Sequence, residues 1–305
     1  RQMCIRDRIR ERCLLMTDLE KICADAYEAR VKIGTLDTDI KNKVLNDAAD
    51  NLLKAEKEIL EANKRDVATA EENMKAKSMI DRLSLDHDRL IGMADGLRQI
   101  AKLADPIGEV MSMAKRPNGL IIGKRRVAIG VVGIIFEARP NVTSDAFGLC
   151  FKTGNCVILK GGSDAINTNI AIVKALKKAL TDNLVSAAAL ALIESTDRET
   201  TNAFMKMDQY VDVLIPRGGA GLIQNVVKNA TIPVIQTGTG NCHVYVDKDA
   251  DFDMAVKIIN NAKTQRISVC NACESIVVHS AIAEEFLPKL YDKLRAVSYT
   301  HLRAH

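Results

Sequence analysis

The sequence contains no tryptophan, and aromatic side chains make up only 4% of its 305 residues. So few aromatic rings argue against a surface on which nucleic-acid bases stack. The net charge points the same way, because 43 basic and 39 acidic residues leave only +4. No apolar run reaches the roughly 20 residues that a membrane-spanning helix needs. The sequence therefore predicts neither a nucleic-acid partner nor a membrane partner.

Metal-site motifs are also missing. There is no H-E-x-x-H, no P-loop and no second C-x-x-C beside the one at Cys270 and Cys273, so we expect no metal. The eight cysteines lack the spacing of a secreted disulfide framework. They predict free thiols in a reducing compartment, and we expect the cytoplasm.

The composition, 47% hydrophobic and 27% charged, suits one large domain or two. Between residues 127 and 227, apolar β-branched runs alternate with segments of helical period, which predicts an α/β fold with a parallel sheet and helices on both faces. The expected strands are 127–136, 156–160, 187–193 and 211–215, and the expected helices are 143–153, 164–181, 198–207 and 220–227. Before them we expect helices from residue 17, over 38–72 and over 79–103, and a hairpin over 108–122 that turns at Asn118-Gly119.

The chain is predicted to cross into a second α/β domain in the Gly- and Thr-rich segment 233–240. We expect the first domain to cover 16–232 and the second to start over 233–296. Residues 3–7 and 297–301 can be encoded by opposite strands of one oligonucleotide. We therefore interpret 1–15 and 297–305 as a non-native leader and tail, with the native sequence starting at Met16 and cut within its second domain.

A cysteine on a loop is the first candidate for chemistry. Cys270 follows a predicted helix over 252–262 and precedes a predicted strand over 275–278. The cations Lys263 and Arg266 precede it, and positive charge favours the thiolate that attacks carbonyl carbons. The alternative is a buried, inert cysteine.

Two glycine-rich segments follow predicted strands. Lys160 ends a strand and is followed by Gly161, Gly162 and Ser163, which places a cation at the sheet edge where nucleotides bind. The alternative is a solvated lysine. By contrast, Gly130 and Gly133 lack the G-x-G-x-x-G spacing and are interpreted as structural.

The second segment contains Arg217, Gly218, Gly219 and Gly221, and it opens a helix. Backbone N–H groups there can approach an anion. A plain strand-to-helix turn is the alternative. The anion could be a cofactor pyrophosphate or an acyl phosphate, and both remain open.

The first long strand leads into Glu137, Arg139 and Asn141. Asn141 could cap the next helix. Arg139 is a candidate for binding a substrate carboxylate or phosphate, and it could equally pair with Glu137.

Five segments together resemble the gamma-glutamyl phosphate reductases, a family of the aldehyde dehydrogenase superfamily. They are NAKTQRISVCNACESIVVH at 261–279, FEARPNVT at 136–143, KTGNCVILKGG at 152–162, LIPRGGAGL at 214–222 and CHVYVD at 242–247. The resemblance covers about residues 16–294 and implies a first domain that binds NADP and a second that is catalytic. The implied reaction is the NADPH-dependent reduction of L-glutamyl 5-phosphate to L-glutamate 5-semialdehyde, through a cysteine thioester, in proline biosynthesis.

The resemblance also implies roles for single residues. Cys270 would be the nucleophile, and the Asn141 amide with the Cys270 N–H would form the oxyanion hole. Lys160, with Ser163, would contact the cofactor ribose and its 2′-phosphate. Substrate-binding residues would be Arg139, Glu137 and Arg266. The hairpin would join subunits of a homo-oligomer, and glutamate 5-kinase would be a possible coupled partner.

One departure from the wider superfamily fits a reductase. Aldehyde-oxidising members carry a water-activating glutamate where this sequence has Gln236. Glutamine cannot act as a general base, so a thioester would resist hydrolysis. The rival hypotheses are a hydrolytic aldehyde dehydrogenase and a non-catalytic nucleotide-binding module.

Overall fold

The computed structural model describes residues 17–75, 77–236, 238, 240–265 and 269–296. Contacts divide the chain into two units at the junction of Thr237 and Gly238. Each unit is described by itself below. The predicted leader and tail, and Arg266 of the cysteine loop, lie outside the described residues.

A four-stranded parallel sheet forms the centre of the first unit, with the strand order β5-β4-β3-β6. All six residues of β3 are buried, as predicted for a strand covered on both faces. It starts at Val131 rather than at the expected residue 127, because Gly130 has a φ of +129° and Val127 and Ile129 are exposed. The strands are β3 (Val131–Phe136), β4 (Cys156–Lys160), β5 (Leu190–Leu192) and β6 (Val213–Arg217).

Gly133, in the middle of β3, has a packing role. A Cβ at this position would lie 2.5 Å from Leu214 Cδ2 and 2.9 Å from Phe204 Cζ. Those side chains come from β6 and from a helix beyond the sheet, so the missing side chain lets both approach the strand. The interpretation of Gly133 as a structural glycine is confirmed.

The helices around the sheet follow the expected pattern with two corrections. The single helix predicted over 38–72 is two helices separated at Ala55, and the bend lets the first pack on α6 and α8 and the second on α5 and α8. The helices of this unit are α2 (Asp18–Gly34), α3 (Thr38–Lys54), α4 (Glu56–Glu72), α5 (Lys77–Leu83), α6 (His87–Lys102), α7 (Asn141–Lys152), α8 (Ile166–Asp182), α9 (Arg198–Phe204) and α10 (Ala220–Asn229), with 3-10 turns η1 (Ser163–Ala165) and η2 (Ala187–Ala189). The prediction of a strand over 187–193 is wrong for its first three residues, because they form the turn η2 and β5 begins only at Leu190.

The helix predicted over 79–103 is also wrong as one element, because α5 and α6 are separate. Asn63 of α4 binds the backbone at the break: its Nδ2 donates to Leu83 O at 2.9 Å, and its Oδ1 accepts from Leu85 N at 2.7 Å. Asp86 then caps α6 by accepting from Arg89 N at 2.7 Å. The Asn63 side chain and the Asp86 cap therefore end one helix and start the next, although the sequence keeps a helical period across the break.

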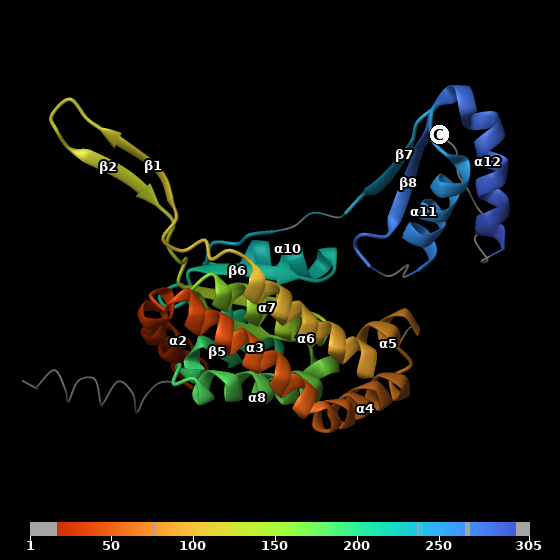
Figure 1. The fold of residues 1–305 in the computed structure, drawn as a ribbon. Helices are drawn as coiled ribbons and strands as arrows, with labels where there is room; N and C mark the ends of the chain where they lie inside the picture. Colours follow the sequence, from red (N-terminus) through yellow and green to blue (C-terminus); the bar gives the residue numbers. More distant parts are fainter. Residues whose placement is uncertain (1–16, 76, 237, 239, 266–268, 297–305) are drawn as a thin grey trace, which may run out of the picture. The chain divides into compact units, whose positions relative to one another are not determined.

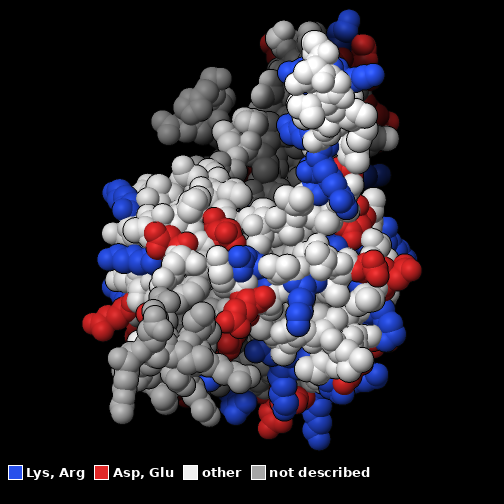
Figure 2. Space-filling view, turned by 90° about the vertical axis from the view of Figure 1, so that its left-hand side faces the viewer, with Lys and Arg blue, Asp and Glu red and all other residues white. Residues whose placement is uncertain are grey.

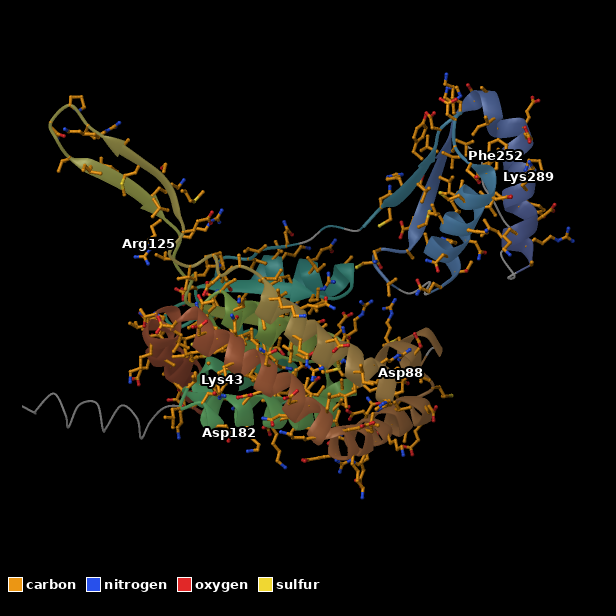
Figure 3. All side chains as sticks on the ribbon, in the orientation of Figure 1. Lys43, Asp88, Arg125, Asp182, Phe252 and Lys289 are labelled. Carbon is orange, nitrogen blue, oxygen red and sulfur yellow. The ribbon has the colours of Figure 1, made fainter. Side chains whose placement is uncertain are left out.

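The predicted hairpin is present as the antiparallel pair β1 (Val110–Lys115) and β2 (Ile121–Arg125) (Figure 1). Its turn closes through Gly119 N, which donates to Arg116 O at 2.9 Å. All residues of both strands are exposed. Arg125 lies at the end of β2 (Figure 3).

The second unit pairs β7 (Cys242–Val246) with β8 (Cys273–Val278) in parallel, with α11 (Phe252–Thr264) between them in sequence and α12 (Ser280–Arg295) after them. Its core contains Val246, Ile259, Phe286, Leu290 and Leu294. Lys289 of α12 places its Nζ 4.9 Å from the centre of the Phe252 ring (Figure 3). The unit is a β-α-β-α segment with a small core of its own.

The helices in the described residues are all too short or too polar to cross a membrane. On the face shown in Figure 2, lysine and arginine side chains lie among aspartate and glutamate side chains. This face therefore carries charge of both signs. Elsewhere in the described residues, ion pairs such as Arg98 with Asp50 and Lys174 with Glu58 join different helices.

Candidate functional site

The order of the strands places a crevice at one edge of the sheet. The chain passes from β3 to β4 and β5 on one side and then returns to β6 on the other side of β3. In open parallel sheets, ligands bind outside the carboxyl ends of the strands at such a reversal. The predicted site residues of the first unit lie at the last residue of β4 or β6, or within five residues after β3, β4 or β6, at this edge.

The glycine turn after β6 is shaped by Glu137, which follows β3. The carboxylate oxygen Oε2 of Glu137 accepts a hydrogen bond from Gly219 N at 3.1 Å. A Cβ on Gly218 would lie 2.7 Å from Glu137 Cδ, so a larger residue there would displace the Glu137 side chain from its present position. Gly219 is the N-cap of α10, and the helix therefore begins against a negative charge from the same chain.

Lys160, the last residue of β4, is buried with only 4% of its surface exposed. Its Nζ donates to Gly161 O at 3.0 Å. Burial lowers the pKa of its ammonium group, and the charge of Asp197 opposes that shift. The alternative of a solvated lysine is therefore wrong. The residue is a desolvated cation at the carboxyl edge of the sheet.

A cavity of about 690 Å³ opens between α6, α7 and the ends of β3 and β6. Most of its wall is apolar, and Ile100, Leu149 and Ile215 contribute to it. Its polar lining residues are Gln99, Arg139, Asn141, Asp145 and Arg217. An apolar cavity with a few polar groups is the common form of a small-molecule site.

Two of those polar residues lie one turn apart on α7. Asn141 is the first residue of the helix, and its Nδ2 donates to Asp145 Oδ2 at 3.3 Å. The alternative that Asn141 caps the helix is wrong, because Pro140 holds the N-cap position and makes no side-chain cap bond. Burial raises the pKa of Asp145, although Asn141 and Arg217 act against the shift. Sequence reasoning missed Asp145, and its signal was the i, i+4 spacing from Asn141.

The cysteine loop belongs to the second unit. Cys270 is exposed, so the alternative of a buried cysteine is wrong, whereas Cys273 is buried as the first residue of β8. The segment before β7 packs against this loop: Cys242 Sγ donates to Cys270 O at 3.6 Å, and a Cβ on Gly240 would lie 2.5 Å from the same oxygen. The loop backbone is therefore held while the Cys270 side chain is accessible.

Comparison with known proteins identifies the family of this chain. The model of the aldehyde dehydrogenase family matches residues 15–304. This chain belongs to the aldehyde dehydrogenase family. It is 99% identical over 280 residues to a gamma-glutamyl phosphate reductase of Agathobacter rectalis, and the match covers 92% of the chain and 67% of that protein. A gamma-glutamyl phosphate reductase of Lachnospira eligens is 55% identical, with 92% and 68% covered.

Solved structures share the fold of this chain. The crystal structure of a gamma-glutamyl phosphate reductase from Thermotoga maritima matches with a TM-score of 0.81 and 43% identity, over 92% of this chain and 68% of that one. A propionaldehyde dehydrogenase from Clostridium phytofermentans matches with a TM-score of 0.67 at 17% identity, over 90% and 59%, which shows the fold alone. The predicted α/β fold and the predicted family are confirmed.

The structure places most of the predicted site residues of the first unit at one edge of the sheet. Glu137 meets the glycine turn, Arg139, Asn141 and Arg217 line the cavity, and Lys160 lies at the end of β4. Gly162 lies beside the Glu137 backbone, with its Cβ position 3.6 Å from Glu137 Cα. Gly221 has no atom within 4 Å of its Cβ position, so packing does not require a glycine there. The described residues contain no cluster of three or more metal-binding side chains.

Proposed function

We propose that this chain reduces L-glutamyl 5-phosphate to L-glutamate 5-semialdehyde and releases phosphate, a step of proline biosynthesis. The 99% identity to a gamma-glutamyl phosphate reductase carries the proposal. The exposed Cys270 on a loop between a helix and a strand supports it, because an acyl phosphate needs a thiol nucleophile in this chemistry. The chain is an oxidoreductase of the aldehyde dehydrogenase family.

The proposed roles follow the chemistry of each residue. The Cys270 thiolate attacks the acyl carbon, and the phosphate leaves to give a thioester. The Asn141 amide and the Cys270 N–H stabilise the oxyanion that forms during the attack. Gln236, where hydrolytic members have a glutamate, cannot activate water, so the thioester persists until it is reduced. Arg139, Glu137 and Arg266 are the proposed substrate-binding residues.

The family implies a nicotinamide cofactor, and we propose NADPH in the first unit. The bound cofactor supplies the hydride that reduces the thioester. The residues at the sheet edge fit it: Lys160 offers a desolvated cation for a 2′-phosphate, with Gly161, Gly162 and Ser163 beside it. The turn of Arg217, Gly218, Gly219 and Gly221 offers backbone N–H groups for a phosphate.

The requirement for phosphate tests the reaction. In the reverse direction, the full-length relative from Agathobacter rectalis is expected to oxidise L-glutamate 5-semialdehyde with NADP⁺ only when phosphate or arsenate is present. NADPH formation followed at 340 nm with and without phosphate gives the answer. Equal rates without phosphate would favour a hydrolytic aldehyde dehydrogenase, and no turnover in either buffer would favour a non-catalytic module.

The exposed hairpin supports a proposed contact between copies of the chain. Six large apolar side chains on or beside its strands are at least half exposed, which is unusual for a surface that stays in water. They are Val110, Met111, Met113, Leu120, Ile121 and Ile122. A homo-oligomer joined through residues 108–122 would cover them. We also propose coupling to glutamate 5-kinase, because an acyl phosphate hydrolyses in water. A cytoplasmic location is proposed from the spacing of the eight cysteines, which predicts free thiols in a reducing compartment.

Charge on the hairpin is expected to break this contact. The double substitution Met113→Glu and Ile121→Glu should give a smaller particle by light scattering on the full-length relative, because buried like charges repel. Lys115→Gln, on the same hairpin, is the matched control and should keep the wild-type mass. An unchanged mass in the double variant would show that the subunit contact lies elsewhere.

A further inference from the structure

The cavity beside α7 contains one negative charge that the proposed reaction has not used. Among the described residues that line it, Asp145 is the only carboxylate, and Arg139 and Arg217 supply the cations. The surrounding wall is formed by apolar side chains such as Ile100, Ile134 and Leu149. A carboxylate in such a wall loses hydration, which is costly unless a partner compensates for it.

The surroundings of Asp145 leave room for such a partner. Its Oδ2 accepts a hydrogen bond from the Asn141 amide at 3.3 Å, and its Oδ1 lies beside Gly96 of α6, 3.8 Å from the position that a Cβ would take there. Burial raises the pKa of Asp145, and the groups that oppose the shift are Asn141 from its own helix and Arg217 from the end of β6. Asp145 is only partly buried and lines the cavity, so a charged group inside the cavity can approach its carboxylate.

The substrate of the proposed function carries a matching set of charges. The glutamyl group has an α-ammonium and an α-carboxylate at the end opposite the acyl phosphate. We propose that Asp145 binds the α-ammonium group, and that it selects amino-acid acyl groups over dicarboxylic acyl groups of the same length. This inference rests on the proposed function. Arg139 and Arg217, in the same cavity, supply the positive charge that the carboxylate or phosphate needs.

The selectivity of the enzyme tests this role. The full-length relative from Agathobacter rectalis is assayed in the reverse direction with L-glutamate 5-semialdehyde and with 5-oxopentanoate, the same chain without the amino group. Asp145→Asn keeps the shape and the acceptor for Asn141 but removes the charge. It is expected to reduce the preference for the amino compound, measured as the ratio of kcat/KM values, by about 10-fold, mainly through KM.

Matched variants separate this role from a structural one. Asp145→Glu should restore part of the preference, because it restores the charge. Asp88→Asn, which makes the same charge change at the exposed start of α6 (Figure 3), should leave the ratio unchanged. An equal loss of kcat with both aldehydes after Asp145→Asn would show that Asp145 only positions Asn141, and an unchanged ratio would show that it does not contact the ammonium. Either result would overturn the inference.

Stability gives a second readout. Because burial raises the pKa of Asp145, its charged form disfavours folding at neutral pH, and this cost disappears as the pH falls below the ordinary value of 3.8. Asp145→Asn should therefore raise Tm at pH 7 and leave it nearly unchanged in acid. A lower Tm at pH 7 would mark a structural residue and contradict the inference. If wild-type enzyme turns over neither aldehyde with phosphate, the proposed function fails instead, which is a separate outcome.

Discussion

Replacing Cys270 with serine is expected to lower turnover by roughly three orders of magnitude or more in the full-length relative, with NADPH binding unchanged. The exposed Cys270 side chain can reach a substrate, while its backbone is held by Gly240 and Cys242. Serine keeps the size of the side chain but is far less nucleophilic near neutral pH. Steady-state kcat and a fluorescence titration with NADPH measure the two quantities separately.

A second thiol of the same unit provides the control for this experiment. Cys242→Ser replaces a half-buried thiol beside the loop with a hydroxyl that can still donate to Cys270 O, and it should therefore retain most of the activity. Limited alkylation followed by peptide mapping should label Cys270 before the buried Cys273. If Cys270→Ser turns over at a near-normal rate, the nucleophile is another group and the thioester route is wrong.

Lys160→Met is expected to weaken NADPH binding by about 100-fold and NADH binding by only a few-fold. Methionine fills the buried volume of the lysine stem, so the variant removes the charge with little change in packing. The 2′-phosphate is present in NADPH and absent from NADH, and the ratio of the two dissociation constants isolates that contact. Lys174→Met, an exposed lysine on α8, is the matched control.

The pH dependence of cofactor binding gives an independent check. Burial lowers the pKa of Lys160, so this group loses its proton before an exposed lysine with the ordinary value of 10.5 does. NADPH affinity should fall as the pH rises towards that value, while NADH affinity stays level. Parallel loss for both cofactors, or an unchanged ratio in Lys160→Met, would assign Lys160 to the fold alone.

The sequence predicted most of the sheet because its strands are buried runs with strong patterns. The expected strand over 156–160 matches β4 residue for residue, and β3 is buried along its whole length. Helix ends were predicted less well, since they depend on contacts from distant parts of the chain. The break between α5 and α6 needs Asn63, 20 residues before Leu83, and no local pattern reveals that bond.

The same distinction holds for the site. Residues that directly follow strands could be placed at the sheet edge, because parallel strands all end there. The burial of a side chain cannot be predicted in this way: the sequence allows a solvated Lys160, and the structure shows that Lys160 is buried. The sequence does not predict Asp145 as a site residue, because it lies inside a helix, where an aspartate usually belongs to a solvated face. Only its bond to Asn141 and the cavity around it distinguish it.

The hydrogen bond from Gly219 to Glu137 means that the start of α10 has an internal ligand. Any phosphate that binds at this N–H competes with a carboxylate tethered to the same unit, whose effective concentration does not depend on dilution. The free energy measured for binding such a phosphate is then the difference between the free energies with which the phosphate and the Glu137 carboxylate bind this N–H. It is smaller than the free energy of the phosphate's own contacts. The turn thereby favours anions that carry more charge than a carboxylate.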